Sequence, residues 1–288
     1  MVRVSTIKNK KSEIKKWAKS KRIELNKALN ELLNSELKDA ESMKKLIAHY
    51  KLVGIYTYSL YNTFLIKAQG GTIAQSFKRW KKLNRHVKKG ERAKIYVYVP
   101  ITVKLETETI DENGEIITEE KEEVRFILKP VFDISQTEGE PLKFEHNSQN
   151  KINLSYEKVK RDIEQATGLK IMESETLETA RGLINNKGYI YVSAFSNDTD
   201  KIKTLIHELA HHLHGHLEED GRDVEVKEVE AEASTYLVLT YFGIDTELSK
   251  AYVLHWRDVE HDKVIQQVKK GRILRVADKI IKMLKDTK

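Results

Sequence analysis

The spacing of hydrophobic residues changes along the chain between a helical period and a strand period. Helical spacing in the first third predicts helices over 10–37, 41–69 and 77–83, the second of them broken near Gly54. The same spacing returns later and predicts helices over 155–167, 200–213, 223–242 and 250–285. The chain is therefore expected to be rich in helices at both ends.

Alternation of apolar and polar residues predicts two groups of strands between these helices. The predicted strands are 93–105, 124–132, 170–174, 181–184 and 189–193. The first two are expected to form a hairpin, because Asn113-Gly114 is a strong turn signal. The acidic segment 106–123 is expected to be the solvated tip of this hairpin. The last two strands are expected to pair around the turn 185–188.

A polar segment without periodic pattern, 145–151, suggests a domain boundary. Two domains of ordinary size suit a chain of 288 residues. We expect a front domain, 1–145, of mixed helix and antiparallel sheet, and a back domain, 152–288, in which a small sheet leads into a helix. The predicted fold class is therefore α+β.

A His-Glu-x-x-His run occupies positions 207 to 211, within the predicted helix 200–213. Residues four apart share a helix face, so His207 and His211 can bind one metal ion. An apolar stripe would bury the rest of this helix, which argues against an incidental pattern on a solvated helix. The run therefore predicts a zinc site, with Glu208 as the general base that takes a proton from water.

The third metal ligand is expected from the acidic helix 223–242. Its acids are Glu225, Glu228, Glu230 and Glu232. Glu228 and Glu232 lie one turn apart on a shared face, whereas Glu230 is rotated by about 200° from Glu228. In a known zinc pattern the ligand glutamate comes first, and an acid four residues later holds a ligand histidine. We therefore predict Glu228 as ligand, Glu232 as the partner of His207 or His211, and Glu225 and Glu230 as solvated charges.

Two alternatives for the third ligand stay open. Glu228 and Glu232 could exchange their roles, because both lie on the same face of the predicted helix. His216 could instead be a third histidine ligand, since it follows His211 by five residues. We rank His216 below Glu228, because the metzincin pattern needs a glycine that this chain lacks at the required place.

Composition bears on the compartment. The chain has no cysteine, so neither disulfides nor thiolate metal sites are possible. No apolar run approaches the length of a membrane span, and the first residues lack the apolar core of a signal peptide. We therefore expect a cytoplasmic protein of a reducing compartment, without membrane contact.

Charge is distributed unevenly behind the net value of +7. Residues 1–100 carry 24 lysines and arginines against 7 acidic residues, while the remaining 188 residues carry 27 against 37. Such a division suggests that the front of the chain meets a polyanion. The plainer alternative is a solvated basic helix surface that needs no partner.

The segment 77–98 indicates which polyanion is bound. It contains nine basic residues and one acid, with aromatic residues interleaved. Cations neutralise phosphates and flat aromatic faces stack unpaired bases, which favours single-stranded DNA, with double-stranded DNA left open as a second ligand. The candidate DNA-binding residues here are Lys78, Arg79, Lys81, Lys82, Arg85, His86, Lys88, Lys89, Arg92 and Lys94. Trp80 is expected in the core, because it shares a helical spacing with Phe77 and Leu83.

Several blocks of residues resemble a known family. Tyr58 to Asn62, Arg85 to Glu91 and Val131 to Thr137 lie in an order and spacing, over about residues 45–142, that resembles the N-terminal domain of ArdC-type antirestriction proteins. The LtrC-like proteins of Gram-positive conjugative elements are similar. The back half, with His207 to His211 and Glu228 to Ala233, resembles the metallopeptidase-type domain of the same family.

This resemblance implies a front domain that binds single-stranded DNA, and it adds Tyr58 and Asn62 to the candidate contacts. It implies a zinc-binding back domain of zincin-like fold with a gluzincin-like HExxH site. It further implies that the protein protects incoming plasmid DNA from host restriction during conjugation. His255 departs from the family, whose members often carry a small residue there, so its role stays open.

Two functions from different classes follow. In the first, the protein is a DNA-binding protector in which zinc mainly stabilises the back domain, without proteolysis. In the second, it is a regulatory zinc metallopeptidase of the ImmA/IrrE type, which cleaves a specific repressor or host protein while DNA only localises it. Whether the chain is an enzyme is thus an open question, with a zinc metallopeptidase as the expected activity if it is one.

Overall fold

The computed structural model describes residues 2–36, 40–53, 58–110, 116–143, 154–177, 182–219, 221–244 and 266–286. The turn expected at 111–114, the polar segment 145–151 and His255 lie outside these residues. The helices are α1 (Val2–Glu36), α2 (Ala40–Val53), α3 (Leu60–Ala68), α4 (Phe77–Lys82), α5 (Tyr156–Thr167), α6 (Asp198–His214), α7 (Val224–Phe242) and α10 (Lys270–Asp286). The strands are β1 (Ala74–Gln75), β2 (Arg85–Val87), β3 (Ile95–Ile110), β4 (Ile116–Asp133), β5 (Thr137–Gly139), β6 (Lys170–Ser174), β7 (Gly182–Ile184) and β8 (Tyr189–Ser193).

The mixture of helices and small sheets is an α+β fold, as predicted. Two compact units make up the chain, and each is discontinuous in sequence. The front unit comprises Met1–Ala28 and Leu65–Leu142, and the back unit comprises Leu29–Phe64 and Lys143–Lys288. The predicted division at 1–145 and 152–288 puts residues 29–64 in the front domain, whereas they group with the back unit. The predicted boundary segment lies outside the described residues, so the division stays a prediction.

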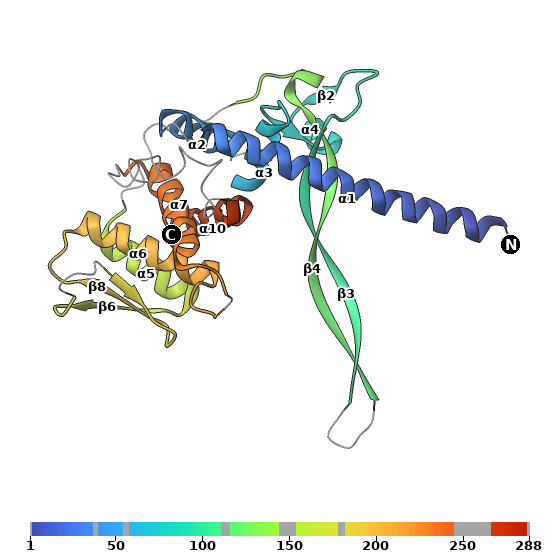
Figure 1. The fold of residues 1–288 in the computed structure, drawn as a ribbon. Helices are drawn as coiled ribbons and strands as arrows, with labels where there is room; N and C mark the ends of the chain where they lie inside the picture. Colours follow the sequence, from blue (N-terminus) through green and yellow to red (C-terminus); the bar gives the residue numbers. More distant parts are fainter. Residues whose placement is uncertain are drawn as a thin grey trace. The chain divides into compact units, whose positions relative to one another are not determined.

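The front unit is built on a long antiparallel ribbon of β3 and β4 (Figure 1). Its pairing runs from Ile95↔Val131 to Ile110↔Ile116, so both strands extend beyond their predicted ends at 105 and 124 into the acidic segment, where every residue with an assigned burial is exposed. In β3 this extension is favoured by β-branched threonine, which alternates with glutamate over 106–109. Opposite charges also face each other across the ribbon, with Lys104 Nζ 2.8 Å from a carboxylate oxygen of Glu120.

Trp80 anchors the core of the front unit. Its side chain is fully buried, as the helical spacing predicted, and its indole Nε1 donates to the carbonyl of Phe132 at 2.8 Å. Val97 and Val131, one from each strand of the ribbon, are buried with it. The hydrogen bond satisfies the one polar atom of the tryptophan, so α4 can bury the whole ring against the end of the ribbon.

Asp133 fixes the chain at the end of β4. Its carboxylate accepts from the backbone N–H groups of Thr72 (2.7 Å), Ile73 (3.2 Å) and Ser135 (3.0 Å). The side chain of Gln136 accepts in return from the backbone of Asp133, which completes a capping box. Burial alone would raise the pKa of Asp133, but hydrogen bonds from Thr72 and Ser135 outweigh burial and lower it.

The back unit places helices on one face of a small sheet. The strand order is β6-β8-β7, with β6 parallel and β7 antiparallel to β8, so β7 is an edge strand. Helices α5 and α6 cover one face of this sheet, and α7 and α10 pack further out against α6 (Figure 1). Helix α7 is buried on nearly all sides, which explains why its apolar residues follow no single stripe.

No helix in the described ranges has both the length and the apolar character that crossing a membrane requires.

We expect the substitution Asp133→Ala to lower the free energy of unfolding of the front unit by about 3 kcal/mol, because it leaves three backbone donors, among them the buried N–H of Ile73, without their acceptor. Urea unfolding followed by circular dichroism measures this loss. Glu138→Ala is the matched control, since Glu138 is exposed on β5 a few residues away. Equal stability of the two variants would contradict the assigned role of Asp133.

Candidate metal centre

Helix α6 begins and ends with well-formed caps. The side chain of Asn197 accepts from the backbone N–H of Asp200 at 2.9 Å, and Gly215 ends the helix in the left-handed conformation at φ 68°. Leu205 and Leu209 are fully buried on its inner face. Rigid caps and a buried stripe hold the helix in one orientation, so its histidines have a defined direction.

The structure brings together His207, His211 and Glu228. The two histidine Nε2 atoms lie 3.0 Å apart. One carboxylate oxygen of Glu228 is 3.4 Å from His207 Nε2, and the other is 3.4 Å from His211 Nε2. Among the described residues, this trio is one of two groups whose ligand atoms all lie within 4.8 Å of one another.

These separations fit the donors of a divalent ion. Zn–N and Zn–O bonds of about 2.0–2.1 Å put tetrahedral donors about 3.3 Å apart, and octahedral donors at similar bond lengths about 2.9 Å apart. The observed values of 3.0 and 3.4 Å fall around these two figures. Hydrogen bonds from His207 and His211 hold the pKa of Glu228 far below its ordinary value, so this carboxylate is an anion. The three side chains could therefore hold a divalent metal.

Glu228 rather than Glu232 faces both imidazoles. Glu232 is half-buried on the next turn of α7, and its negative charge contributes to raising the pKa of His207. Burial alone would lower that pKa, but the hydrogen bond to Glu228 and the charge of Glu208 outweigh burial. The geometry thus favours the predicted assignment of Glu228 over the reverse one.

Glu208 lies beside the edge strand β7. Burial raises the pKa of Glu208, and the charges of His207 and His211 oppose that rise. Its carboxylate also interacts with the backbone N–H of Ile184. A raised pKa brings a carboxylate closer to the range in which a general base works at neutral pH.

Gly182 lets β7 approach α6 closely enough for this contact. A Cβ atom at this position would lie 2.2 Å from the side chain of Thr204 and 3.0 Å from the carbonyl oxygen of Tyr191. Only glycine therefore fits between the helix and the sheet at this point.

The prediction that Glu230 is a solvated charge was wrong. Glu230 is fully buried, and its carboxylate accepts from the guanidinium of Arg222 at 2.9 Å and from the backbone N–H of Lys269 at 2.9 Å. His216 Nε2 lies 3.2 Å from the same carboxylate. Because α7 is buried over most of its length from Glu230 onward, the face opposite Glu228 also points into protein there. Glu225, by contrast, is exposed as expected.

His214 and His216, which follow the candidate ligand His211 in the chain, are both buried. His214 Nε2 lies 2.8 Å from the hydroxyl of Ser234, and burial lowers the pKa of His214 to about 3. Burial also lowers the pKa of His216. His216 Nδ1 lies 3.0 Å from His211 Nδ1, on the side of that ring away from Glu228, so the structure does not place His216 as a third histidine ligand.

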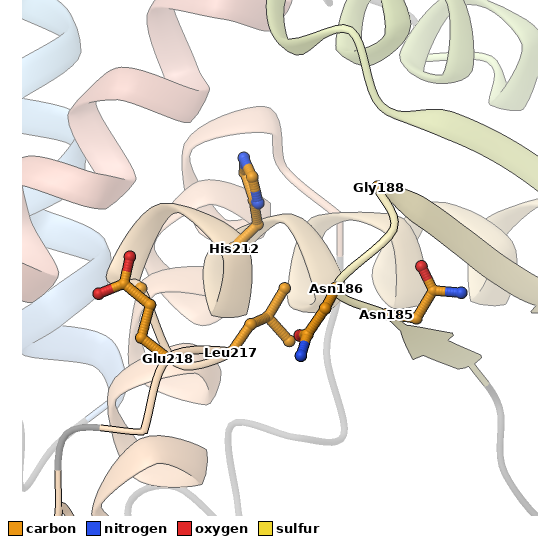
Figure 2. A pocket seen from close by; sticks show the side chains of 7 residues that line it. Asn185, Asn186, Gly188, His212, Leu217 and Glu218 are labelled. Carbon is orange, nitrogen blue, oxygen red and sulfur yellow. The ribbon is translucent and has the colours of Figure 1, made fainter.

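A pocket of about 380 Å³ opens between the β7–β8 turn and the end of α6 (Figure 2). Asn185, Asn186 and His212 are among the residues that line it. None of the three candidate metal ligands lines this pocket, so it does not extend the metal centre.

The basic residues predicted to bind DNA form an exposed surface in the front unit. They lie on α4, on β2 and in the turn that follows β2, and α4 packs against β2. The exposed members are Lys78, Lys81, Lys82, His86, Lys88, Lys89, Arg92 and Lys94, which we call the basic surface. The structure therefore gathers most of the predicted residues on α4, on β2 and in the segment that follows β2.

Among the comparisons with known proteins, a family model matches the front of the chain. Residues 25–132 match the family described as the N-terminal domain of anti-restriction factor ArdC. This segment is an ArdC N-terminal domain. An uncharacterized protein of Bacillus anthracis, pXO2-81, is 30% identical to the chain over 73% of the chain and 43% of that protein. The chain thus spans less than half the length of this curated relative.

Two solved structures of the ArdC antirestriction protein from plasmid R388 are also similar. The Mn(II)-bound structure has 19% identity and a TM-score of 0.42, and covers 89% of this chain and 99% of that one. The metal-free structure has 21% identity and a TM-score of 0.37, and covers 79% and 84%.

Four of the predicted DNA contacts in the ArdC N-terminal domain do not join the basic surface, and the first of them, Arg79, is half-buried on α4. The guanidinium of Arg85 donates to the hydroxyl of Thr137 at 2.9 Å and to the carbonyl of Gly139 at 3.2 Å, so it holds β5 against β2. Asn62 is buried, and it lies in the back unit together with Tyr58. Burial raises the pKa of Tyr58 to about 12. Sequence spacing could not separate these structural residues from exposed ones.

His214 should make the back unit sensitive to mild acid. The pKa of His214 is about 3 in the folded chain, and in the unfolded chain it takes the ordinary value of 6.5. As pH falls through 6.5 the unfolded state therefore binds a proton that the folded state does not, and the free energy of unfolding decreases. Between pH 6.5 and 5 this costs about 2 kcal/mol of stability. Urea unfolding at both pH values, with a chelator present, should show a smaller loss for His214→Gln than for wild type. His86→Gln, at an exposed histidine, should keep the wild-type loss.

Proposed function

We propose that this chain is an antirestriction protein of a mobile element, which binds single-stranded DNA through its basic surface and holds Zn²⁺ between His207, His211 and Glu228. The observation that carries the proposal is the match of residues 25–132 to the ArdC N-terminal domain. A cytoplasmic location belongs to the same proposal, since restriction acts on DNA inside the cell. The chain has no cysteine and hence no disulfide that a reducing compartment would break.

The basic surface suits a nucleic acid backbone for electrostatic reasons. Lysine side chains that point into solvent can each neutralise a phosphate and release a counterion. Phe77 is 54% exposed at the start of α4, which leaves an aromatic face beside the lysines for a base to stack on. Single strands fit this combination better than duplex DNA, because their bases are free to stack.

We expect the triple substitution of Lys81, Lys82 and Lys89 by alanine to weaken binding to a single-stranded oligonucleotide. The slope of log affinity against log salt should flatten by about 2, because each lost phosphate contact removes about 0.7 from the slope. Fluorescence anisotropy titrations over a range of salt measure it. Alanine at Lys187, Lys279 and Lys285, exposed lysines of the back unit, is the matched control. An unchanged slope in the first triple variant would remove the basic surface from the proposal.

Zinc is the metal we assign, on the chemistry of the donors. Two imidazole nitrogens and one carboxylate are a common protein set for zinc that keeps a further position open. Such an ion, when bound, supplies Lewis acidity and lowers the pKa of water. Glu208, next to His207 in sequence and with its pKa raised by burial, would take the proton from that water.

A regulatory peptidase is the second candidate function, and the edge strand β7 favours it. Beyond β7 the sheet has no further strand among the described residues, so an extended peptide could add there through backbone hydrogen bonds. Glu208 would then lie close to the bound peptide, because its carboxylate interacts with Ile184 of this strand. Proteolysis is not needed for DNA protection, so one variant separates the two functions.

We expect His211→Ala to lose bound zinc and Glu208→Gln to keep about one equivalent per chain, because only the first removes a ligand. Elemental analysis of the purified proteins measures this, with Glu225→Gln as control. Protection of incoming DNA by Glu208→Gln that equals wild type would favour the protector without proteolysis. Loss of protection in a variant that still holds zinc would favour the hydrolase. Wild-type protein that takes up no zinc would refute the metal centre.

A further inference from the structure

We propose that His216 and Glu230 form a relay that positions the metal ligand His211, an inference that rests on the proposed metal centre. The relay runs from His211 through the ring of His216 to the buried carboxylate of Glu230, and Arg222 holds the far end. Its members would not touch the metal or a substrate, so His216 and Glu230 are positioning residues.

The two nitrogens of His211 face different partners. Its Nε2 lies with His207 and Glu228, at 3.0 and 3.4 Å, where a metal would bind. Its Nδ1 lies 3.0 Å from His216 Nδ1. A ring nitrogen that binds a metal offers a lone pair, so the proton of neutral His211 must then be on Nδ1. His211 Nδ1–H therefore donates to His216 Nδ1.

The end of α6 places His216 for this contact. Gly215 adopts φ 68°, and the backbone N–H of His216 donates to the carbonyl of His211 at 3.0 Å. The N–H of Gly215 donates to the carbonyl of His212 at 3.0 Å, which completes a Schellman motif. This turn reverses the chain directly after the helix. It thereby brings the ring of His216 against the ring of His211, with centroids 5.0 Å apart.

Glu230 completes the chain of hydrogen bonds. With its Nδ1 accepting from His211, neutral His216 carries its proton on Nε2 and donates to Glu230 at 3.2 Å. The carboxylate is fully buried, and Arg222 and the backbone of Lys269 satisfy its remaining capacity. A buried anion with complete hydrogen bonding is rigid, so the orientation of both rings is set from this end.

The turn is itself tied down. The guanidinium of Arg222 also donates to the carbonyls of His214 at 3.3 Å and Gly215 at 3.4 Å. The ammonium group of Lys227 donates to the carbonyl of His216 at 3.0 Å. These contacts hold the backbone of the relay independently of its rings, so a change of ring chemistry alone need not disturb the turn.

His214, His216 and Glu230 could instead be a second metal site, because their donor atoms also lie within 4.8 Å of one another. Two observations disfavour it. The guanidinium of Arg222 already lies 2.9 Å from the carboxylate oxygen that such an ion would need, and two cations repel each other at that range. Both ring nitrogens of His216 are engaged, one with His211 and one with Glu230.

A relay of this kind strengthens the metal ligand. A hydrogen bond from the free N–H of a ligand histidine fixes its tautomer and raises its basicity, and removal of such partners costs about 10–100-fold in metal affinity. We therefore expect Glu230→Gln and His216→Leu each to bind zinc about 10–100-fold more weakly than wild type, still with one equivalent per chain. Competition with a chromophoric chelator measures the affinity.

A rescue variant separates positioning from packing. The side-chain oxygen of asparagine can take the place of the Nδ1 acceptor but not of the contact with Glu230, so His216→Asn should recover part of the zinc affinity that His216→Leu loses. A role in packing alone predicts the reverse order, since leucine fills the buried site with apolar volume. Glu225→Gln, on the exposed part of α7, should bind zinc as wild type does.

A spectroscopic measurement on the wild-type protein keeps the test independent of folding. Long-range ¹H–¹⁵N correlation spectra of the zinc-loaded protein should show His211 with its proton on Nδ1 and His216 with its proton on Nε2. A proton on Nε2 of His211 would overturn the relay, and so would wild-type affinity in both Glu230→Gln and His216→Leu. Two zinc equivalents in wild type, one of them lost in Glu230→Gln, would establish a second site instead. No zinc in wild type at all would refute the metal centre itself.

Discussion

The packing of α6 against α7 is the contact on which the candidate centre depends. It sets the imidazoles of His207 and His211 against Glu228, and it sets His216 against Glu230 on the other side of His211. A rotation of either helix by one residue, about 100°, would separate both pairs. The apolar residues that bury the two helices therefore determine the geometry of the polar ones, although they carry no chemistry themselves.

The front unit presents many cationic side chains on the surface of a stable core. The indole of Trp80 and the carboxylate of Asp133 both make hydrogen bonds at the end of the ribbon and stabilise it. The lysines of α4 and of the turn after β2 are exposed around this core. Two basic residues also tie the chain together, because Lys88 donates to the carbonyl of Ser135 and the guanidinium of Arg85 bonds to β5.

Glu230 shows where helix periodicity stops being informative. Its rotation away from Glu228 was predicted correctly, but the inference that it faces solvent assumed a helix with one exposed side. Helix α7 is covered on nearly all sides, so the second face is also an interior. A buried carboxylate there needs partners, and Arg222, Lys269 and His216 supply them. The pattern His211, Gly215, His216 was the available signal, because a glycine cap returns the next residue toward the last turn.

The sequence by itself determined the α+β class, most helices and strands, the pairing of His207 with His211 and the basic composition of 77–98. These properties depend on the spacing of residues along the chain, because helices and strands each bring residues of a fixed spacing onto one face. The tertiary structure decided which helix faces are interior, which basic residues are exposed, and that residues 29–64 group with the back unit. Burial depends on what packs against a segment from elsewhere in the chain, and no local pattern contains that information.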